Sequence, residues 1–148
     1  MSESTDAVLA YWAEHRQQLR QCESQRATLT NFLLVITAGL SGLIIQQRFA
    51  DTTLPLSALI TLTGLYGALA TAKYHERAHY HLLQARALTN TLKAMNVLAD
   101  DPHLAQYRET HYAAYPRLSR IRLHWLWTGL HLTIAVFGAV LALIALIR

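Results

Sequence analysis

Five consecutive residues, His75-Glu76-Arg77-Ala78-His79, match the pattern H-E-x-x-H and have the clearest capacity for chemistry. Residues four apart share a helix face, so two imidazoles can hold Zn²⁺ here while the glutamate activates a water molecule. Third ligands could come from His81, His103, Glu109 or His111. Arg77 weakens the match, because zinc helices usually keep their central positions uncharged, and no second lobe forms a substrate cleft. We prefer the interpretation that these polar residues lie at a membrane interface, where a helix leaves the bilayer, and that the protein is not an enzyme and binds no metal or cofactor. A zinc-dependent membrane hydrolase is kept as an alternative.

A second group of polar residues lies within the apolar stretch 123–147. His124, Thr128 and His131 recur at spacings of four and three, which places them on one helix face. An ionisable residue deep in an apolar span is a functional candidate, as a proton acceptor, a ligand or part of a pore lining. A neutral imidazole bonded to a neighbouring helix is the simpler interpretation. The sequence leaves both open.

The other two apolar stretches carry hydroxyl, amide and small residues. Asn31, Thr37 and Ser41 are pore-lining or interhelical candidates in the first stretch, and hydrogen bonds between helices are the commoner use of such residues. Small residues four apart allow helix backbones to approach closely. On that basis we expect four residues to lie at helix contacts: Gly42, Gly64, Ala68 and Gly138.

Three charge-free stretches must position these residues. The chain has 148 residues, 53% hydrophobic and only 15% charged, against about 25% charged in typical soluble domains. About 20 predominantly apolar residues suffice for a helix to cross a bilayer. The sequence therefore predicts transmembrane helices over about 27–47, 53–73 and 123–147, and excludes an ordinary soluble enzyme, a disordered tail and a disulfide scaffold.

The distribution of positive charge predicts orientation. Of 13 Lys and Arg residues, 11 lie before Ala27 or between Lys73 and Arg122. Because cytoplasmic loops carry the excess of such residues, we place the N-terminus and 74–122 in the cytoplasm, and Arg148 outside. The net charge of +4 then indicates anionic lipid headgroups rather than nucleic acid as the partner. The predicted location is a bacterial inner membrane.

Amphipathic segments are expected to extend the spans into the cytoplasm, over about 5–26 and 74–122. The first helix should begin after the capping cluster 4–6, and the second should run on to Asp100-Asp101-Pro102. A third helix from Pro102 should be kinked or restarted at Pro116 before the last span. The predicted fold class is all-α: one membrane domain, 1–148, built as an integral helical bundle.

The layout resembles a known group of proteins. An amphipathic helix ends in Ser24-Gln25-Arg26-Ala27-Thr28-Leu29-Thr30-Asn31-Phe32 and enters a span, and after a six-residue turn a second span runs into a long basic helix. Over roughly 5–99 this is similar to SLATT-type and RipA-like small bacterial membrane proteins. The resemblance implies an oligomer that perturbs the inner membrane when a partner signals, often in anti-phage conflict, and it implies no catalytic residues. The third span departs from the simplest two-span plan.

Together these features predict a homo-oligomeric inner-membrane protein that acts as a channel-like or membrane-disrupting effector. The alternative, a different class of function, is a membrane scaffold whose cytoplasmic helices recruit a soluble partner enzyme. Ion leakage through membranes that contain the assembled protein would favour the first, and a stoichiometric cytosolic partner without leakage the second.

Overall fold

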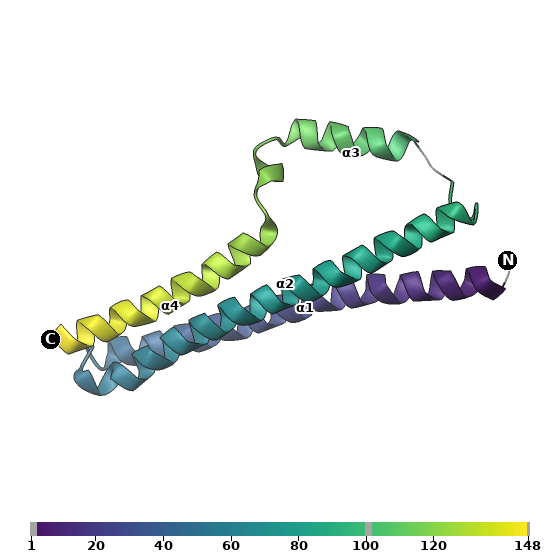
Figure 1. Ribbon diagram of the computed structural model, residues 1–148. Coiled ribbons are helices and arrows are strands. Elements are labelled where there is room, and N and C mark those ends of the chain that lie inside the picture. Colours follow the sequence, from purple (N-terminus) through teal and green to yellow (C-terminus); the bar gives the residue numbers. More distant parts are fainter. Residues whose placement is uncertain (1–2, 100–101, 148) are drawn as a thin grey trace. The chain divides into compact units, whose positions relative to one another are not determined.

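The computed structural model describes residues 3–99 and 102–147, and 90% of these described residues are helical. Within the described ranges there are four α-helices: α1 (Glu3–Gln46), α2 (Leu54–Ala94), α3 (Pro102–Ala114) and α4 (Leu123–Ile147) (Figure 1). Short 3-10 turns, η1 (Asp51–Thr53) and η2 (Leu118–Arg120), lie in the connections. The all-α prediction is confirmed. Three stretches, Glu3–Gln46, Asp51–Ala94 and Leu123–Ile147, are long and apolar enough to cross a membrane.

The chain divides into two compact units. The apolar unit contains Glu23–His75 and Leu123–Arg148, and the polar unit contains Met1–Cys22 and Glu76–Arg122. These boundaries fall close to the ends of the three charge-free stretches. Both α1 and α2 are continuous helices that contribute to each unit. The change in composition along the chain therefore coincides with a change in packing.

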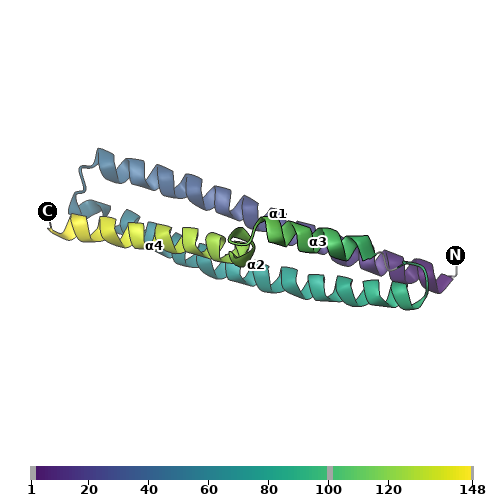
Figure 2. The ribbon, with the colours of Figure 1, turned by 90° about the horizontal axis from the view of Figure 1, so that it is seen from above.

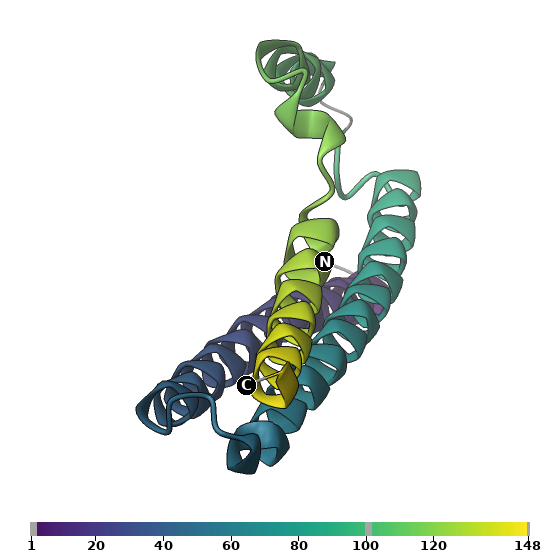
Figure 3. The same ribbon diagram turned by 90° about the vertical axis from the view of Figure 1, so that its left-hand side faces the viewer.

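Three helix segments lie side by side in the apolar unit. The C-terminal half of α1 and the N-terminal half of α2 form a hairpin, and α4 packs along them with its C-terminal end at the η1 turn (Figures 2 and 3). The buried core contains Ile44 of α1, Ile60 of α2, and Ile134 and Leu141 of α4. Apolar side chains at these positions recur with helical spacing, which explains why one face of each helix is buried.

The hairpin turn between α1 and α2 is closed by backbone hydrogen bonds. Arg48 N–H donates to Ile45 O at 3.0 Å and Phe49 N–H donates to Ile44 O at 3.1 Å, which is the Schellman pattern. Arg48 adopts a positive φ of 54°, a conformation that favours glycine. Phe49 packs against the core that includes Ile44. This apolar contact accompanies the motif and holds the left-handed turn in place.

Two predicted helix boundaries are wrong. α1 already begins at Glu3, so the cluster 4–6 lies inside its first turn, where Asp6 still suits the positive end of the helix dipole. α2 ends at Ala94, well before the predicted stop at Asp100 and Asp101, both of which lie outside the described residues. Its end is a second Schellman motif: Asn96 has φ 57°, and Val97 N–H donates to Leu92 O at 3.0 Å.

Pro116 separates α3 from α4. α3 ends at Ala114, and eight residues follow before α4 begins at Leu123. A residue preceding proline is disfavoured in the helical conformation, and proline lacks the N–H that the next turn would need. Ile121 is extended, with φ −80° and ψ 114°, so the helix does not restart directly after the proline.

Glycines allow the backbones of α2 and α4 to touch. A Cβ on Gly64 would collide with the amide nitrogen of Ala135 and lie 2.7 Å from its Cα. A Cβ on Gly138 would lie 2.6 Å from Thr61 Oγ1. Ala68 is also buried, whereas a Cβ on Gly42 of α1 would have no neighbouring side chain or other helix within 4 Å. Three of the four expected contact residues therefore pack inside the unit, and Gly42 faces outward.

We expect Gly64→Ala to destabilise the apolar unit and Gly42→Ala to leave it unchanged or slightly more stable. The first methyl group meets backbone atoms that cannot rotate away, which costs about 1–3 kcal/mol. The second enters open space, and alanine is the better helix former by up to about 1 kcal/mol. Thermal unfolding in detergent measures both. Equal unfolding temperatures for the two variants would contradict this packing.

Candidate functional site

His131 of α4 is the most deeply buried histidine of the apolar unit, with no exposed surface. Its Nε2 lies 3.1 Å from the Thr30 hydroxyl, and that hydroxyl also lies 3.0 Å from the Arg26 carbonyl oxygen. A threonine hydroxyl has a single hydrogen and two acceptor positions, so it can take part in both contacts at once. Which atom donates between Thr30 and His131 depends on the tautomer of the imidazole. The predicted intramembrane histidine is a hydrogen-bonded link between α4 and α1.

The other ring nitrogen of His131 faces α2. Nδ1 is sealed from the surface and has no hydrogen-bond partner among the described residues, and a Cβ on Gly67 would collide with it. Gly67 is thus the position that makes room for the imidazole. It was not among the residues expected at helix contacts. Its place three residues after Gly64, on the same helix face, is the signal that could have identified it.

Arg26 of α1 is a second residue whose position was not expected from the sequence. It is only 7% exposed, and its guanidinium carbon lies 5.1 Å from the centre of the Trp127 ring on α4. Within the described part of the chain, neither Arg26 Nε nor Trp127 Nε1 has a hydrogen-bond partner, although both atoms are sealed from the surface. The spacing Cys22, Arg26, Thr30 continues the buried stripe of α1, which could have indicated that this arginine faces inward.

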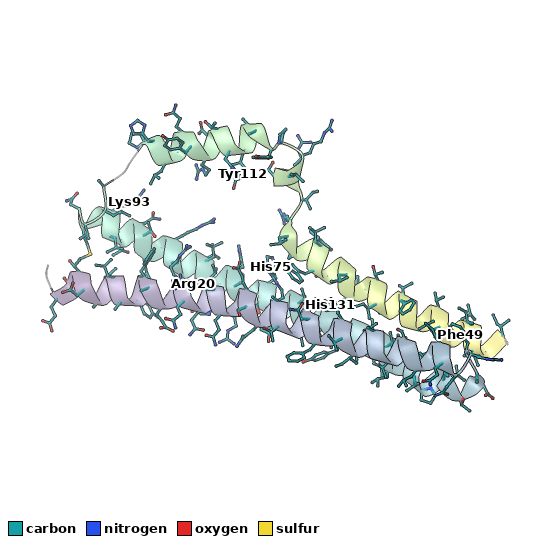
Figure 4. All side chains as sticks on the ribbon, turned by 180° about the vertical axis from the view of Figure 1, so that it is seen from behind. Arg20, Phe49, His75, Lys93, Tyr112 and His131 are labelled. Atoms are coloured by element: carbon teal, nitrogen blue, oxygen red, sulfur yellow. The ribbon has the colours of Figure 1, made fainter. Side chains whose placement is uncertain are left out.

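Two histidines stack where α2 leaves the apolar unit. The rings of His75 and His124 lie 3.9 Å apart at an angle of 11°. Figure 4 labels His75 on α2. His79 is exposed on α2. Across the described residues, no group of three or more His, Cys, Asp or Glu side chains is placed to hold a metal ion. The predicted third ligand to His75 and His79 is not found there, and the zinc hydrolase stays a prediction.

The remaining predicted residues divide between inward and outward faces. Thr37 is buried and Thr128 is half-buried, and the Ser41 hydroxyl donates to Thr37 O at 2.6 Å. Asn31 is exposed and borders a shallow hollow of about 270 Å³, together with Thr28, Phe32 and Val35. Of the pore-lining or interhelical candidates, Asn31 therefore faces outward, away from the packed interior.

The polar unit contains a pair of histidines that joins α1 to α2. His15 Nδ1 lies 2.9 Å from His81 Nδ1, so one nitrogen donates a proton and the other accepts it. His15 is buried, and its Nε2 has no partner in the ranges that the structure describes. Nearby, Trp12 Nε1 donates to the Thr89 hydroxyl at 3.0 Å. Both histidines recur at helical spacing with apolar neighbours, but nothing in the sequence pairs them.

The two histidine contacts, His131 with Thr30 and His15 with His81, join helices through hydrogen bonds that contain no acidic residue. In the sequence of the apolar unit, Glu23 and Asp51 are the acidic residues, and Arg26 forms no ion pair with any residue the structure describes. No protein-family model, curated protein or solved structure matches the chain. Functional inference therefore rests on this geometry.

We expect the pairing of α1 and α2 in the polar unit to weaken in acid. Burial lowers the pKa of His81 from its ordinary value of 6.5, and the charges of His15 and Arg77 lower it further, while Glu14 acts in the opposite direction. The unfolded chain therefore binds protons more readily than the folded one. Stability should be complete above about pH 6.5 and fall as the pH drops towards the folded-state pKa of His81.

Thermal unfolding at about pH 7.5 and about pH 5.5 measures this effect. His81→Gln, which can still accept or donate a hydrogen bond, should lose much of the pH dependence. His103→Gln removes an exposed histidine of α3 and is the matched control. The same acid-induced loss of stability in the unmodified protein and in both variants would contradict a role for the histidine pair. The rings of Tyr11 and Tyr80 also lie close to His15.

Proposed function

We propose that the chain crosses the bacterial inner membrane three times, with its N-terminus and polar unit in the cytoplasm. Large apolar side chains cover the outer surface of the apolar unit: Val35 is 71% exposed and Leu69 is 73% exposed. Soluble proteins rarely expose continuous apolar surface of this extent, whereas lipid tails are a suitable surround. The concentration of Lys and Arg in the polar unit supports the orientation.

We further propose that the protein assembles with copies of itself into a channel-like or membrane-disrupting effector. The observation that carries this is Asn31, an amide exposed on a span whose other outward residues are mostly apolar or small. A carboxamide gains when it pairs with another helix rather than facing lipid. Gly39 and Gly42 follow on the outward side of α1 with nothing within 4 Å, so a second helix can approach there.

The inward residues support a pore between copies over a pore within one copy. His131 is fully buried and bonded to Thr30, and the backbones of α2 and α4 touch at Gly64 and Gly138. The interior of a single three-helix unit is therefore filled. A water path lined by polar residues therefore needs several copies of the protein. In such an assembly Asn31 faces either the water path or the contact between neighbouring copies. Perturbation of the membrane is also what the resemblance to SLATT-type proteins implies.

Asn31→Leu should reduce assembly and leakage together. Interhelical hydrogen bonds in membranes contribute about 0.6–2 kcal/mol, so the dissociation constant should rise about threefold or more. Mass measurement of the detergent-solubilised complex gives the copy number, and dye release from liposomes gives leakage. Val136→Leu, an exposed substitution on α4, is the control. Protein that stays monomeric, in liposomes that stay tight, would overturn the proposal.

A membrane scaffold is the second candidate, and α3 is the observation that favours it. No residue of α3 is buried and Tyr107 is 73% exposed, although Leu104 borders a hollow of about 370 Å³ that α3 shares with the end of α2. Leu104, Tyr107 and His111 recur at helical spacing and leave an apolar and aromatic face for a soluble partner.

If α3 recruits a cytosolic protein, Tyr107→Ser should abolish its co-purification, because aromatic residues dominate the energy of such contacts. A loss of about tenfold or more in recovered partner is expected from removing one such side chain. Thr110→Ser, at an exposed position of the same helix, should retain the partner. The scaffold is contradicted if no protein co-purifies in stoichiometric amount, or if both variants retain it equally.

A further inference from the structure

Arg26 is a buried cation for which the described part of the protein provides no anion. Its Nε is sealed from the surface without an acceptor, so the 7% exposure of the residue belongs to its other atoms. Glu23, one turn before it, is exposed and makes no ion pair with it. Asp51 belongs to the hairpin turn, where its carboxylate accepts from Thr52 N–H at 2.8 Å. Neither acid of the apolar unit neutralises the guanidinium.

A buried charge without a counter-charge is unfavourable, because the energy lost on leaving water is not recovered. Arginine stays protonated under all physiological conditions, so it cannot avoid this cost by losing its proton. The Trp127 ring recovers part of this energy, and an anion lying against Arg26 would recover more. The planar guanidinium, with its parallel N–H groups, fits the oxygens of a phosphate particularly well.

Trp127 provides a second donor beside the guanidinium. Its ring lies against the guanidinium, 5.1 Å from centre to carbon, and its Nε1–H is sealed, with no acceptor among the described residues. The two unused donors come from different helices, α1 and α4, of the same unit. Arg26 directly precedes the first charge-free stretch, and Trp127 lies in the first turns of α4. In a bilayer, arginine and tryptophan at the end of a span lie at headgroup depth.

We propose that Arg26 and Trp127 bind the phosphate group of an anionic phospholipid. Arg26 supplies charge and N–H groups, and the Trp127 indole N–H donates to a further phosphate oxygen. Free inorganic phosphate has the same chemistry, and displacement of bound lipid by phosphate separates the two sources. The choice of a lipid rests on the proposed membrane embedding, whereas the case for an anion rests on the sealed donors of Arg26 and Trp127 and on the lack of an acidic partner among the described residues.

The bound phosphate would join α1 to α4 at one edge of the apolar unit. Arg26 already contributes its carbonyl oxygen to the chain of hydrogen bonds that runs through Thr30 to His131. A ligand held by the Arg26 and Trp127 side chains therefore adds a second link between the same two helices, one turn from the first. Binding should consequently raise the unfolding temperature of the protein.

Native mass spectrometry of the full chain in detergent tests the site, with phosphatidylglycerol and phosphatidylcholine as probes. We expect one tightly bound phosphatidylglycerol per protomer and weaker binding of phosphatidylcholine. Arg26→Gln should weaken phosphatidylglycerol binding about tenfold or more, as expected for losing a charge-assisted hydrogen bond. Arg20→Gln, which neutralises an exposed arginine on the same helix, should change it less than about twofold.

Trp127→Phe keeps the ring against Arg26 and removes the indole N–H, so it should weaken binding severalfold while the protein stays folded. Trp125→Phe alters an exposed tryptophan and is its control. Displacement of the lipid by millimolar inorganic phosphate would identify free phosphate as the ligand and overturn the lipid assignment. Equal binding of both lipids, or equal losses in Arg26→Gln and Arg20→Gln, would overturn the site.

The same spectra report the number of copies, so the site and the proposed assembly fail separately. An intact oligomer without selective lipid binding would overturn the site and leave the assembly in place. A monomer that retains the lipid would do the reverse. If Arg26→Gln does not fold, Arg26→Lys, which retains the charge but lacks the planar N–H pair, and Trp127→Phe give the decisive comparison.

Discussion

Close contact between the backbones of α2 and α4 is the constraint on which the apolar unit depends. At Gly64 and Gly138 the neighbouring helix occupies the space that any side chain would need, and at Gly67 an imidazole occupies it. In the proposed membrane setting, helices gain little from burying apolar groups against each other, so dense packing and internal hydrogen bonds would hold them together. The glycines make both possible, because they bring α4 near enough for His131 to reach Thr30 across the unit.

Few polar side chains lie in the interior of the apolar unit, and most of their hydrogen bonds are to backbone carbonyl oxygens of their own helix. The Thr30 hydroxyl bonds both to the carbonyl oxygen of Arg26 on its own helix and to His131, and the Thr37 carbonyl oxygen accepts from the Ser41 hydroxyl. Several hydroxyls of the spans are satisfied by the carbonyl four residues earlier, as are Ser57 and Thr61. Such bonds let polar residues lie in an apolar surround without a partner on another helix. His131 differs, because an imidazole cannot reach its own backbone in this way and so specifies a partner.

The positions of the helices could largely be predicted from sequence, whereas their partners could not. Charge-free stretches of sufficient length predict spans from local composition, and Pro116 predicts a break because its effect is local. The end of α2 could not be predicted, because it depends on the left-handed conformation of Asn96, and composition alone does not indicate that conformation. From sequence Arg26 is one of the positive charges that predict orientation, and its burial cannot be predicted because it depends on how α1 is rotated against α4. The pairing of His15 with His81 depends likewise on the register of two distant segments.

The contrast between His131 and Asn31 separates two uses of polar residues in a span. His131 has a partner at Nε2, no exposed surface and a glycine that makes room for it, while its Nδ1 has no hydrogen-bond partner among the described residues. Asn31 lies on the outward side of α1, beside a shallow hollow and on the side where Gly39 and Gly42 leave open space. His131 is thus held between helices of one copy, whereas an exposed amide on an apolar helix face gains from a partner outside the single chain. For this reason the outward amide, and not the buried histidine, is the residue from which assembly is inferred.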